Sequence, residues 1–173
     1  MINQELVREI NLIVIHCSGT RFDKDVTAKD IDAYHRTLGY SCAGYHYYIR
    51  KDGSIQTMRP EHRIGAHALG YNKNSIGVCY EGGLDENSKP SDTRTLKQQI
   101  ALHLLVYNLL LKYPKARVVG HRDLSPDLNH DGIIAPYERV KQCPCFDAIP
   151  ELEHFRPSPS VRNEPFAMVE IRR

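Results

Sequence analysis

Two histidines and two cysteines are the residues of this chain whose types and positions suit metal chemistry. His16 and His121 are each the first polar residue after a short apolar run. Such runs are typical of buried strands, so the two imidazoles would share one rim of a sheet if the strands are neighbours. A thiolate from Cys143 or Cys145 could reach the same rim from a loop. Zinc accepts two nitrogens and one sulfur and keeps a fourth position open for water or substrate, although on spacing alone these residues could equally end strands in turns.

The segment between His121 and Cys143 matches the template of a calcium-binding loop. Gly132 lies at the required turn, and the ligand positions are held by Asp127, Asn129, Asp131 and Glu138. Pro126 leaves no room for an entering helix, so this would be a single loop and not an EF-hand pair. The alternative is an Asx-rich turn that braces the loop carrying Lys141 and Cys143. If calcium binds, calcium titration should raise the melting temperature.

Apolar periodicity predicts strands that alternate with helices. The expected strands cover residues 10–15, 45–50, 54–59, 74–80 and 116–120, and the expected helices cover 27–38 and 95–112. Thr27 and Asp30 form a capping box for the first helix, whose apolar face would carry Ile31, Tyr34 and Leu38. Residues 82–92 are polar and turn-rich, which predicts a loop. We therefore expect an α/β fold, a single domain with a mixed central β-sheet flanked by helices and a zinc cleft at the strand ends.

Length and composition limit the domain organisation and the partners. The 173 residues suit one domain, expected over residues 1–150, with a Pro-rich C-terminal tail or wrap over 151–173. The formal net charge of +2 comes without a basic block, which argues against nucleic acid as a partner. Residues 1–9 lack the apolar core of a secretory signal, and no later run reaches membrane-spanning length. We expect a monomer made in the cytoplasm without a signal peptide and without membrane insertion.

Six segments resemble, in order along residues 10–147, the phage-lysozyme type N-acetylmuramoyl-L-alanine amidases, the type 2 zinc amidases related to animal peptidoglycan recognition proteins. These segments are residues 15–18, 44–46, 65–72, 74–78, 120–122 and 141–144. The resemblance implies that His16, His121 and Cys143 bind zinc and that Tyr45 and Lys141 form the catalytic pair. It further implies zinc-dependent hydrolysis of the amide bond between N-acetylmuramic acid and L-alanine in peptidoglycan. The chain would then act on the bacterial cell wall, as an antimicrobial endolysin or a wall-recycling enzyme.

The same resemblance leaves several roles to be decided. We expect His67, Asn72 and Asn74 to line the substrate cleft. His46, His67 and Arg122 either orient ligands or hold substrate, or they make structural hydrogen bonds. One alternative function is a non-catalytic module that binds peptidoglycan. Another is a structural zinc protein in which Cys145 is the fourth ligand. The family spacing favours Cys143 over Cys145, and Cys17 should point to the opposite side of its strand from His16.

Overall fold

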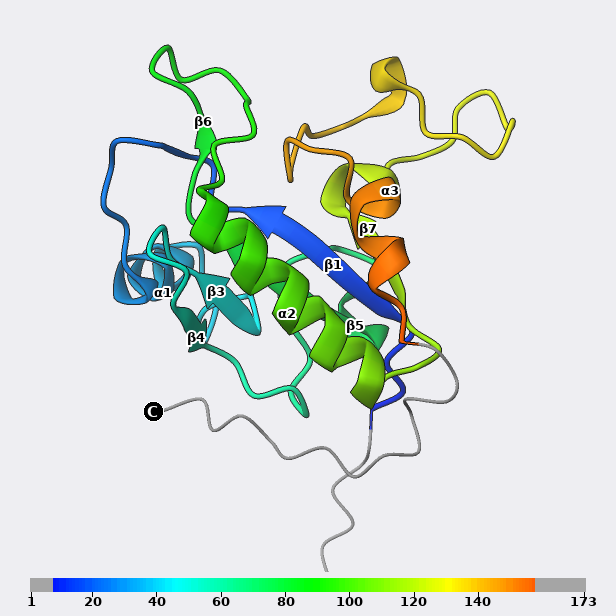
Figure 1. Cartoon of the computed structure of the whole chain (residues 1–173), viewed down its shortest axis with the longest axis horizontal. Helices are drawn as coiled ribbons and strands as arrows, with labels where there is room; N and C mark the ends of the chain where they lie inside the picture. The colour runs from blue at the N-terminus through cyan, green and yellow to red at the C-terminus, as the bar shows by residue number, and fades with distance from the viewer. Residues whose placement is uncertain (1–7, 158–173) are drawn as a thin grey trace, which may run out of the picture.

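A five-stranded mixed sheet forms the centre of the computed structural model, which describes residues 8–157. Its order is β4-β3-β5-β1-β7, with β1 (Leu12–Cys17) parallel to both β5 (Ser75–Tyr80) and β7 (Arg117–Gly120). On the other side of β5, β3 (Tyr47–Ile49) runs parallel to β5, and β4 (Ile55–Thr57) runs antiparallel to β3. Helices lie against this sheet (Figure 1), so the expected α/β architecture is confirmed.

The pairing of β1 with β7 sets the position of the two histidines. Ile15 pairs with Gly120, so His16 and His121 follow neighbouring positions of adjacent parallel strands. The strands are buried because their side chains are apolar on both faces, as in Ile13, Val14 and Ile15, which have no exposed surface. The common rim expected for the two imidazoles therefore exists.

Two helices cover the sheet. In α2 (Leu96–Lys112), capped by Thr95 and Gln98, the core-facing residues are Ala101, Leu102, Leu105, Val106, Leu109 and Leu110. The helix α1 (Ala28–Thr37) has the expected capping box, but its predicted apolar face is only partly right. Tyr34 and Leu38 are 59% and 53% exposed, whereas His35 is buried. The reason is that His35 Nδ1 accepts a hydrogen bond from the Gly44 amide at 2.8 Å, which turns the helix towards the segment before β3.

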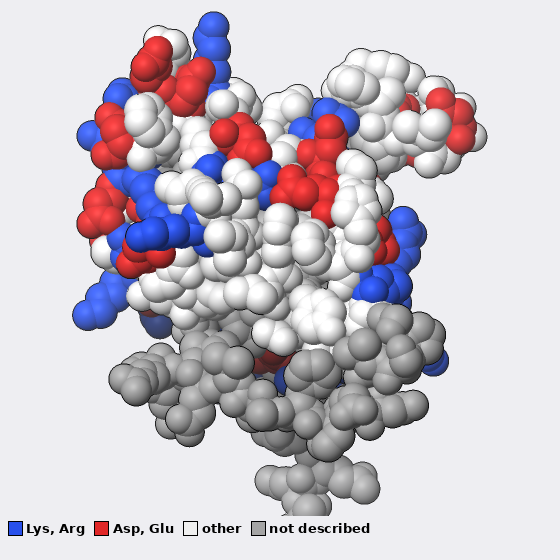
Figure 2. Space-filling model, viewed as in Figure 1, with Lys and Arg blue, Asp and Glu red and all other residues white. Residues whose placement is uncertain are grey.

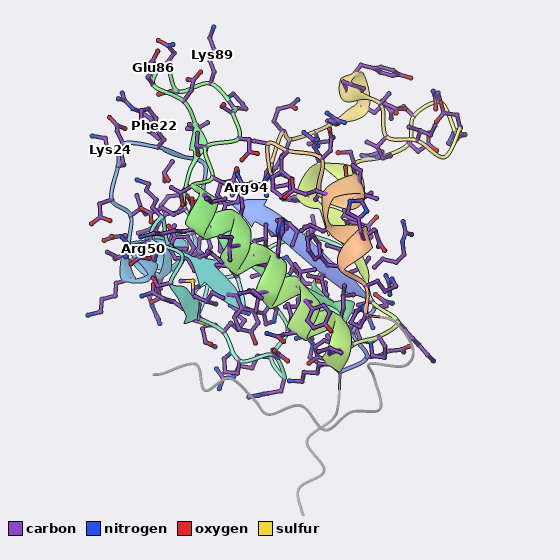
Figure 3. All side chains as sticks on the ribbon, viewed as in Figure 1. Phe22, Lys24, Arg50, Glu86, Lys89 and Arg94 are labelled. Carbon is purple, nitrogen blue, oxygen red and sulfur yellow. The ribbon has the colours of Figure 1, made fainter. Side chains whose placement is uncertain are left out.

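Short elements complete the fold. The expected loop 82–92 contributes β6 (Gly83–Leu84), which pairs in parallel with β2 (Thr20–Arg21) as a second, two-stranded sheet. The 3₁₀ helices are Asn72–Asn74, His121–Leu124, Pro136–Glu138 and Glu153–Phe155. Glu81 is buried and follows β5 directly. Its carboxylate accepts hydrogen bonds from the Val26 amide and from Arg50, which is labelled in Figure 3. These bonds tie the segment before α1 to the sheet.

The chain after β7 forms two distinct structures. Residues 125–140 make an arm that stands away from the sheet in Figure 1 and is mostly uncharged in Figure 2. The helix α3 (Ala148–Leu152) then packs on β7. The expected domain boundary at residue 150 falls inside α3, whose Leu152 is fully buried, and residues 158–173 of the expected tail lie outside the described residues. Within residues 8–157, the helices are too short or too polar to cross a bilayer.

Candidate metal centre

His16, His121 and Cys143 bring one ligand atom each to a common point. These three atoms all lie within 4.8 Å of one another, and His16 Nδ1 is 3.8 Å from Cys143 Sγ. Zn–N and Zn–S bonds of about 2.1 and 2.3 Å at a tetrahedral angle would separate N from S by roughly 3.6 Å. The donor set and its spacing therefore fit a zinc ion.

Burial keeps the two imidazoles neutral, which is the form that binds a metal. It lowers the pKa of His16 well below its ordinary value, and the neighbouring His67, His121 and Lys141 lower it further. Burial, with a smaller contribution from Lys141, also lowers the pKa of His121 to about 4. Near neutral pH no proton competes with a metal for either ring.

His67 fixes the orientation of the His16 ring. His16 Nε2 lies 3.0 Å from His67 Nδ1, and His67 Nε2 lies 3.3 Å from Ser75 Oγ. If His16 Nδ1 faces the metal, His16 Nε2 carries the proton and donates it to His67. A Cβ at Gly65 or Gly77 would come within 2.6 Å of the His67 ring, so both glycines make room for it. Both ring nitrogens of His67 face protein atoms, so these contacts fit the orienting of a ligand, which is one of the roles considered for it.

Cys143 and Cys145 point in different directions. Cys143 Sγ accepts the Cys17 amide at 3.2 Å and faces His16. Cys145 Sγ instead lies 3.3 Å from the Gly83 carbonyl oxygen and 3.8 Å from Cys17 Sγ. Among residues 8–157, the group that could hold an ion contains Cys143 and not Cys145. The protein thus supplies three ligands there, which argues against a closed structural zinc site.

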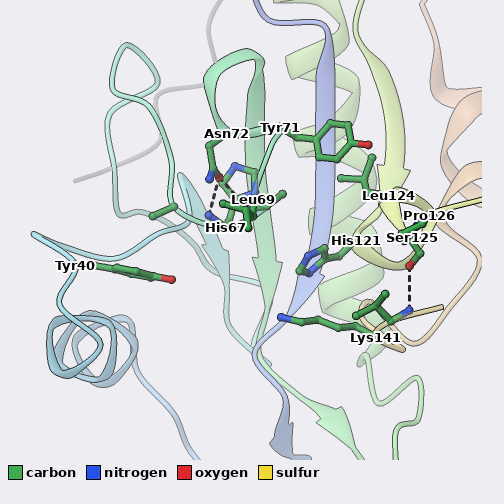
Figure 4. A pocket seen from close by; sticks show the side chains of 13 residues that line it. Tyr40, His67, Leu69, Tyr71, Asn72, His121, Leu124, Ser125, Pro126 and Lys141 are labelled. Atoms are coloured by element: carbon green, nitrogen blue, oxygen red, sulfur yellow. Dashed lines mark hydrogen bonds between the residues drawn. The ribbon is translucent and has the colours of Figure 1, made fainter. Parts of the chain in front are cut away.

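Tyr45 and Lys141 both lie near this centre. The Tyr45 ring is 5.1 Å from the His16 ring, and burial raises the pKa of its hydroxyl well above the ordinary value, so it stays protonated. Tyr45 precedes β3 by two residues and is not within the strand expected over residues 45–50. Lys141 is exposed, and Figure 4 shows its side chain reaching past His121 towards β1. The arrangement offers a proton donor and a cation at one metal position.

An open groove of about 660 Å³ lies over His121 and Lys141. Figure 4 shows its walls, which are Tyr40, Ala66, His67, Ala68, Leu69, Tyr71 and Asn72 together with Leu124, Ser125, Pro126 and Val140. Sequence reasoning missed the apolar wall. Leu69 is 96% exposed there, and a large apolar side chain inside the segment 65–72 was the available signal.

Residues 6–145 match the family described as N-acetylmuramoyl-L-alanine amidase. The chain belongs to this family. The amidase is 34% identical to the endolysin of Enterobacteria phage K11, over 81% of this chain and 83% of that protein. Among solved structures, it is 31% identical to the N-acetylmuramoyl-L-alanine amidase LysC from Clostridium intestinale URNW, with a TM-score of 0.64 over 85% of this chain and 83% of that one. Bumblebee PGRP-SA, at 24% identity, shares the fold with a TM-score of 0.64 over 86% and 83% of the two chains. The expected family and enzyme class are confirmed.

The two asparagines that we expected in the substrate cleft of this amidase lie in different places. Asn72 lines the groove and shapes it, because its Oδ1 accepts the amides of His67 and Ala68 at 2.8 and 2.9 Å. Asn74 is not part of the groove wall, and its Nδ2 donates to the Glu9 carbonyl oxygen at 2.9 Å. β5 runs parallel to β1, so the residue before β5 lies at the end of the sheet opposite the metal ligands.

We predict that Asn72→Ala and Asn74→Ala differ in stability. Asn72→Ala removes the partner of two part-buried amides and should lower the free energy of unfolding by roughly 1–3 kcal/mol. Asn74→Ala removes one exposed hydrogen bond and should cost less than about 1 kcal/mol, with hydrolysis unchanged. Urea denaturation of the two variants measures this. Equal losses would contradict the assignment.

His46 and Arg122 make structural contacts. His46 Nδ1 accepts the Gly77 amide at 3.0 Å, and its Nε2 lies 3.0 Å from the Arg63 carbonyl oxygen. Arg122 is buried and pairs with Asp147. Of the two alternatives expected for these residues, structural hydrogen bonding is the one observed.

The calcium-loop segment is braced by its own acidic side chains. Glu138, only 3% exposed, accepts the amides of Leu128, Asn129 and Ala135 at 2.8, 3.2 and 2.7 Å. Asp127 accepts the Gly132 amide at 2.8 Å. The acidic side chains of this segment do not form a metal-holding group among the described residues. Calcium therefore has no support here, and the segment is held instead by hydrogen bonds among its own residues.

Proposed function

We propose that this amidase cuts the bond between N-acetylmuramic acid and L-alanine in a zinc-dependent reaction, with His16, His121 and Cys143 as the zinc ligands. The observation that carries the proposal is the convergence of their three ligand atoms within 4.8 Å beside an open groove. Bound zinc would lower the pKa of a water molecule towards ~7 and polarise the scissile carbonyl.

The protein residues supply orientation, charge and protons. The groove holds the sugar lactyl group and the start of the stem peptide so that the amide faces the metal position. The Lys141 ammonium stabilises negative charge that develops on the carbonyl oxygen. The protonated Tyr45 hydroxyl donates a hydrogen bond at the wall of the site.

Mass spectrometry of digested peptidoglycan tests the proposed bond. We expect stem peptides with a free L-alanine amine and glycan strands with an intact lactyl carboxylate. Peptides that end elsewhere would sink the proposal.

The competing function is a module that binds peptidoglycan without cutting it. The three ligands, Tyr45 and Lys141 together favour hydrolysis, because binding alone does not need a metal ligand set. A turbidity assay on cell walls with added zinc separates the two functions. Clearing supports hydrolysis, and binding without clearing supports the module.

We also propose that His67 positions the zinc ligand and predict its effect on metal affinity. His67→Ala removes the acceptor of His16 Nε2 and should weaken zinc binding by roughly 10–100-fold. His67→Asn keeps an acceptor near the position of Nδ1 and should restore part of the affinity. Competition with a chromogenic chelator measures both variants. Unchanged affinity in His67→Ala would leave His67 with a packing role only.

A further inference from the structure

Two thiols outside the ligand group face each other behind the metal centre. Cys17 Sγ and Cys145 Sγ lie 3.8 Å apart, although 128 positions separate the residues in sequence. Cys17 ends β1, and Cys145 follows the ligand Cys143 by two positions. The other two cysteines lie elsewhere, with Cys79 buried within β5 and Cys42 ahead of β3.

A glycine beside the pair leaves room for the two sulfurs. A Cβ at Gly83 would lie 2.5 Å from Cys17 Sγ and 3.8 Å from Cys145 Sγ, so glycine at this position accommodates the Cys17 thiol. The Gly83 carbonyl oxygen also accepts from Cys145 Sγ. Cys17 is buried and Cys145 is half-buried, so a small oxidant reaches Cys145 first.

We propose that Cys17 and Cys145 form a disulfide when the amidase meets a disulfide oxidant of the oxidised-glutathione class. Cys145 Sγ attacks one sulfur of the oxidant, which releases one thiol and leaves a mixed disulfide. Cys17 Sγ then attacks Cys145 Sγ and releases the second thiol. The two protons lost by the cysteines pass to the two released thiols, and the two electrons reduce the oxidant. The sulfurs must close from 3.8 Å to about 2.05 Å.

The cross-link would join the two segments that carry metal ligands. Cys17 is next to His16, and Cys145 is two residues from Cys143, so the bond holds the end of β1 against the loop after the arm. Because it closes a loop of more than a hundred residues, it restricts the unfolded chain strongly. Disulfides persist outside the cytoplasm, where the cell wall lies. Only this last point rests on the proposed function.

Disulfide mapping of the native, zinc-loaded protein tests the proposal. After incubation with oxidised glutathione and alkylation of free thiols, trypsin should yield residues 9–21 linked to residues 142–162. The second peptide contains both Cys143 and Cys145, so fragmentation between them identifies the bonded sulfur. We expect Cys145 to be bonded and Cys143 to be free. A fully reduced protein, or a bond to Cys143, overturns the proposal.

Thermal unfolding provides a second measurement that does not depend on hydrolysis. Oxidation should raise the melting temperature by roughly 5–10 °C, and dithiothreitol should reverse the shift. The shift should vanish in Cys17→Ser and in Cys145→Ser, and it should persist in the control Cys42→Ser. A shift that persists in Cys145→Ser contradicts the proposed pair. A mapped disulfide in a protein whose reduced, zinc-loaded form does not cut peptidoglycan would instead count against the proposed reaction and leave the disulfide standing.

Discussion

Cys143→Ser is expected to lose its bound zinc and to hydrolyse peptidoglycan roughly 10³-fold more slowly than the parent amidase. A serine hydroxyl is a poor zinc ligand at neutral pH, so two imidazoles alone would have to hold the ion. A bound metal contributes several kcal/mol of transition-state stabilisation in such reactions, which corresponds to about this factor in rate. Zinc per chain after gel filtration and the release of L-alanine amines are the two measurements.

Cys145→Ser is the matched control for this variant. It makes the same change of sulfur to oxygen two residues away, at a side chain that faces the Gly83 carbonyl oxygen and not the ligand group. Under reducing conditions, its zinc content and its rate should equal those of the parent. If Cys143→Ser kept one zinc per chain while Cys145→Ser lost it, the two cysteines would have to exchange roles.

Local sequence signals predicted the strands that deliver the ligands. The apolar runs before His16 and His121 favour buried strands, and β1 and β7 are indeed neighbours. The capping box of Thr27 and Asp30 likewise predicted where the first helix begins, because a cap acts within one turn.

Sequence reasoning reached its limit where the position of a side chain depends on distant partners. Asn72 and Asn74 are two positions apart in sequence, yet the groove includes only the first, and nothing local indicates that Asn74 binds the Glu9 carbonyl oxygen. The contact of His67 with His16 was not visible in the sequence, because 51 positions separate the two residues.

The calcium template shows a different limit of sequence reasoning. The pattern fits both a cation site and a turn, because oxygens that could bind calcium also accept backbone amides. In this chain the Glu138 carboxylate accepts hydrogen bonds from three backbone amides. Only the positions of these amides in the structure show that the carboxylate serves a turn.

Lys141→Ala should keep its zinc and yet turn over roughly 10²-fold more slowly, with the loss in kcat and not in KM. Lys141 is exposed on the groove wall and is not one of the three ligands, so the metal does not need it. Its charge acts only when the carbonyl oxygen becomes negative, which is the condition for a loss confined to the transition state. Kinetics on a soluble muropeptide, with zinc measured in the same samples, gives both quantities.

Two variants decide what Lys141 contributes. Lys141→Arg keeps the cation and should recover part of the rate. Lys115→Ala makes the same charge change on an exposed lysine before β7, at the opposite end of the strand from His121, and should leave the rate unchanged. A parental rate in Lys141→Ala would refute its part in the chemistry. If Lys141→Ala lost its zinc, the fall in rate would follow from the empty site. Lys141 would then be a residue that helps to retain the metal.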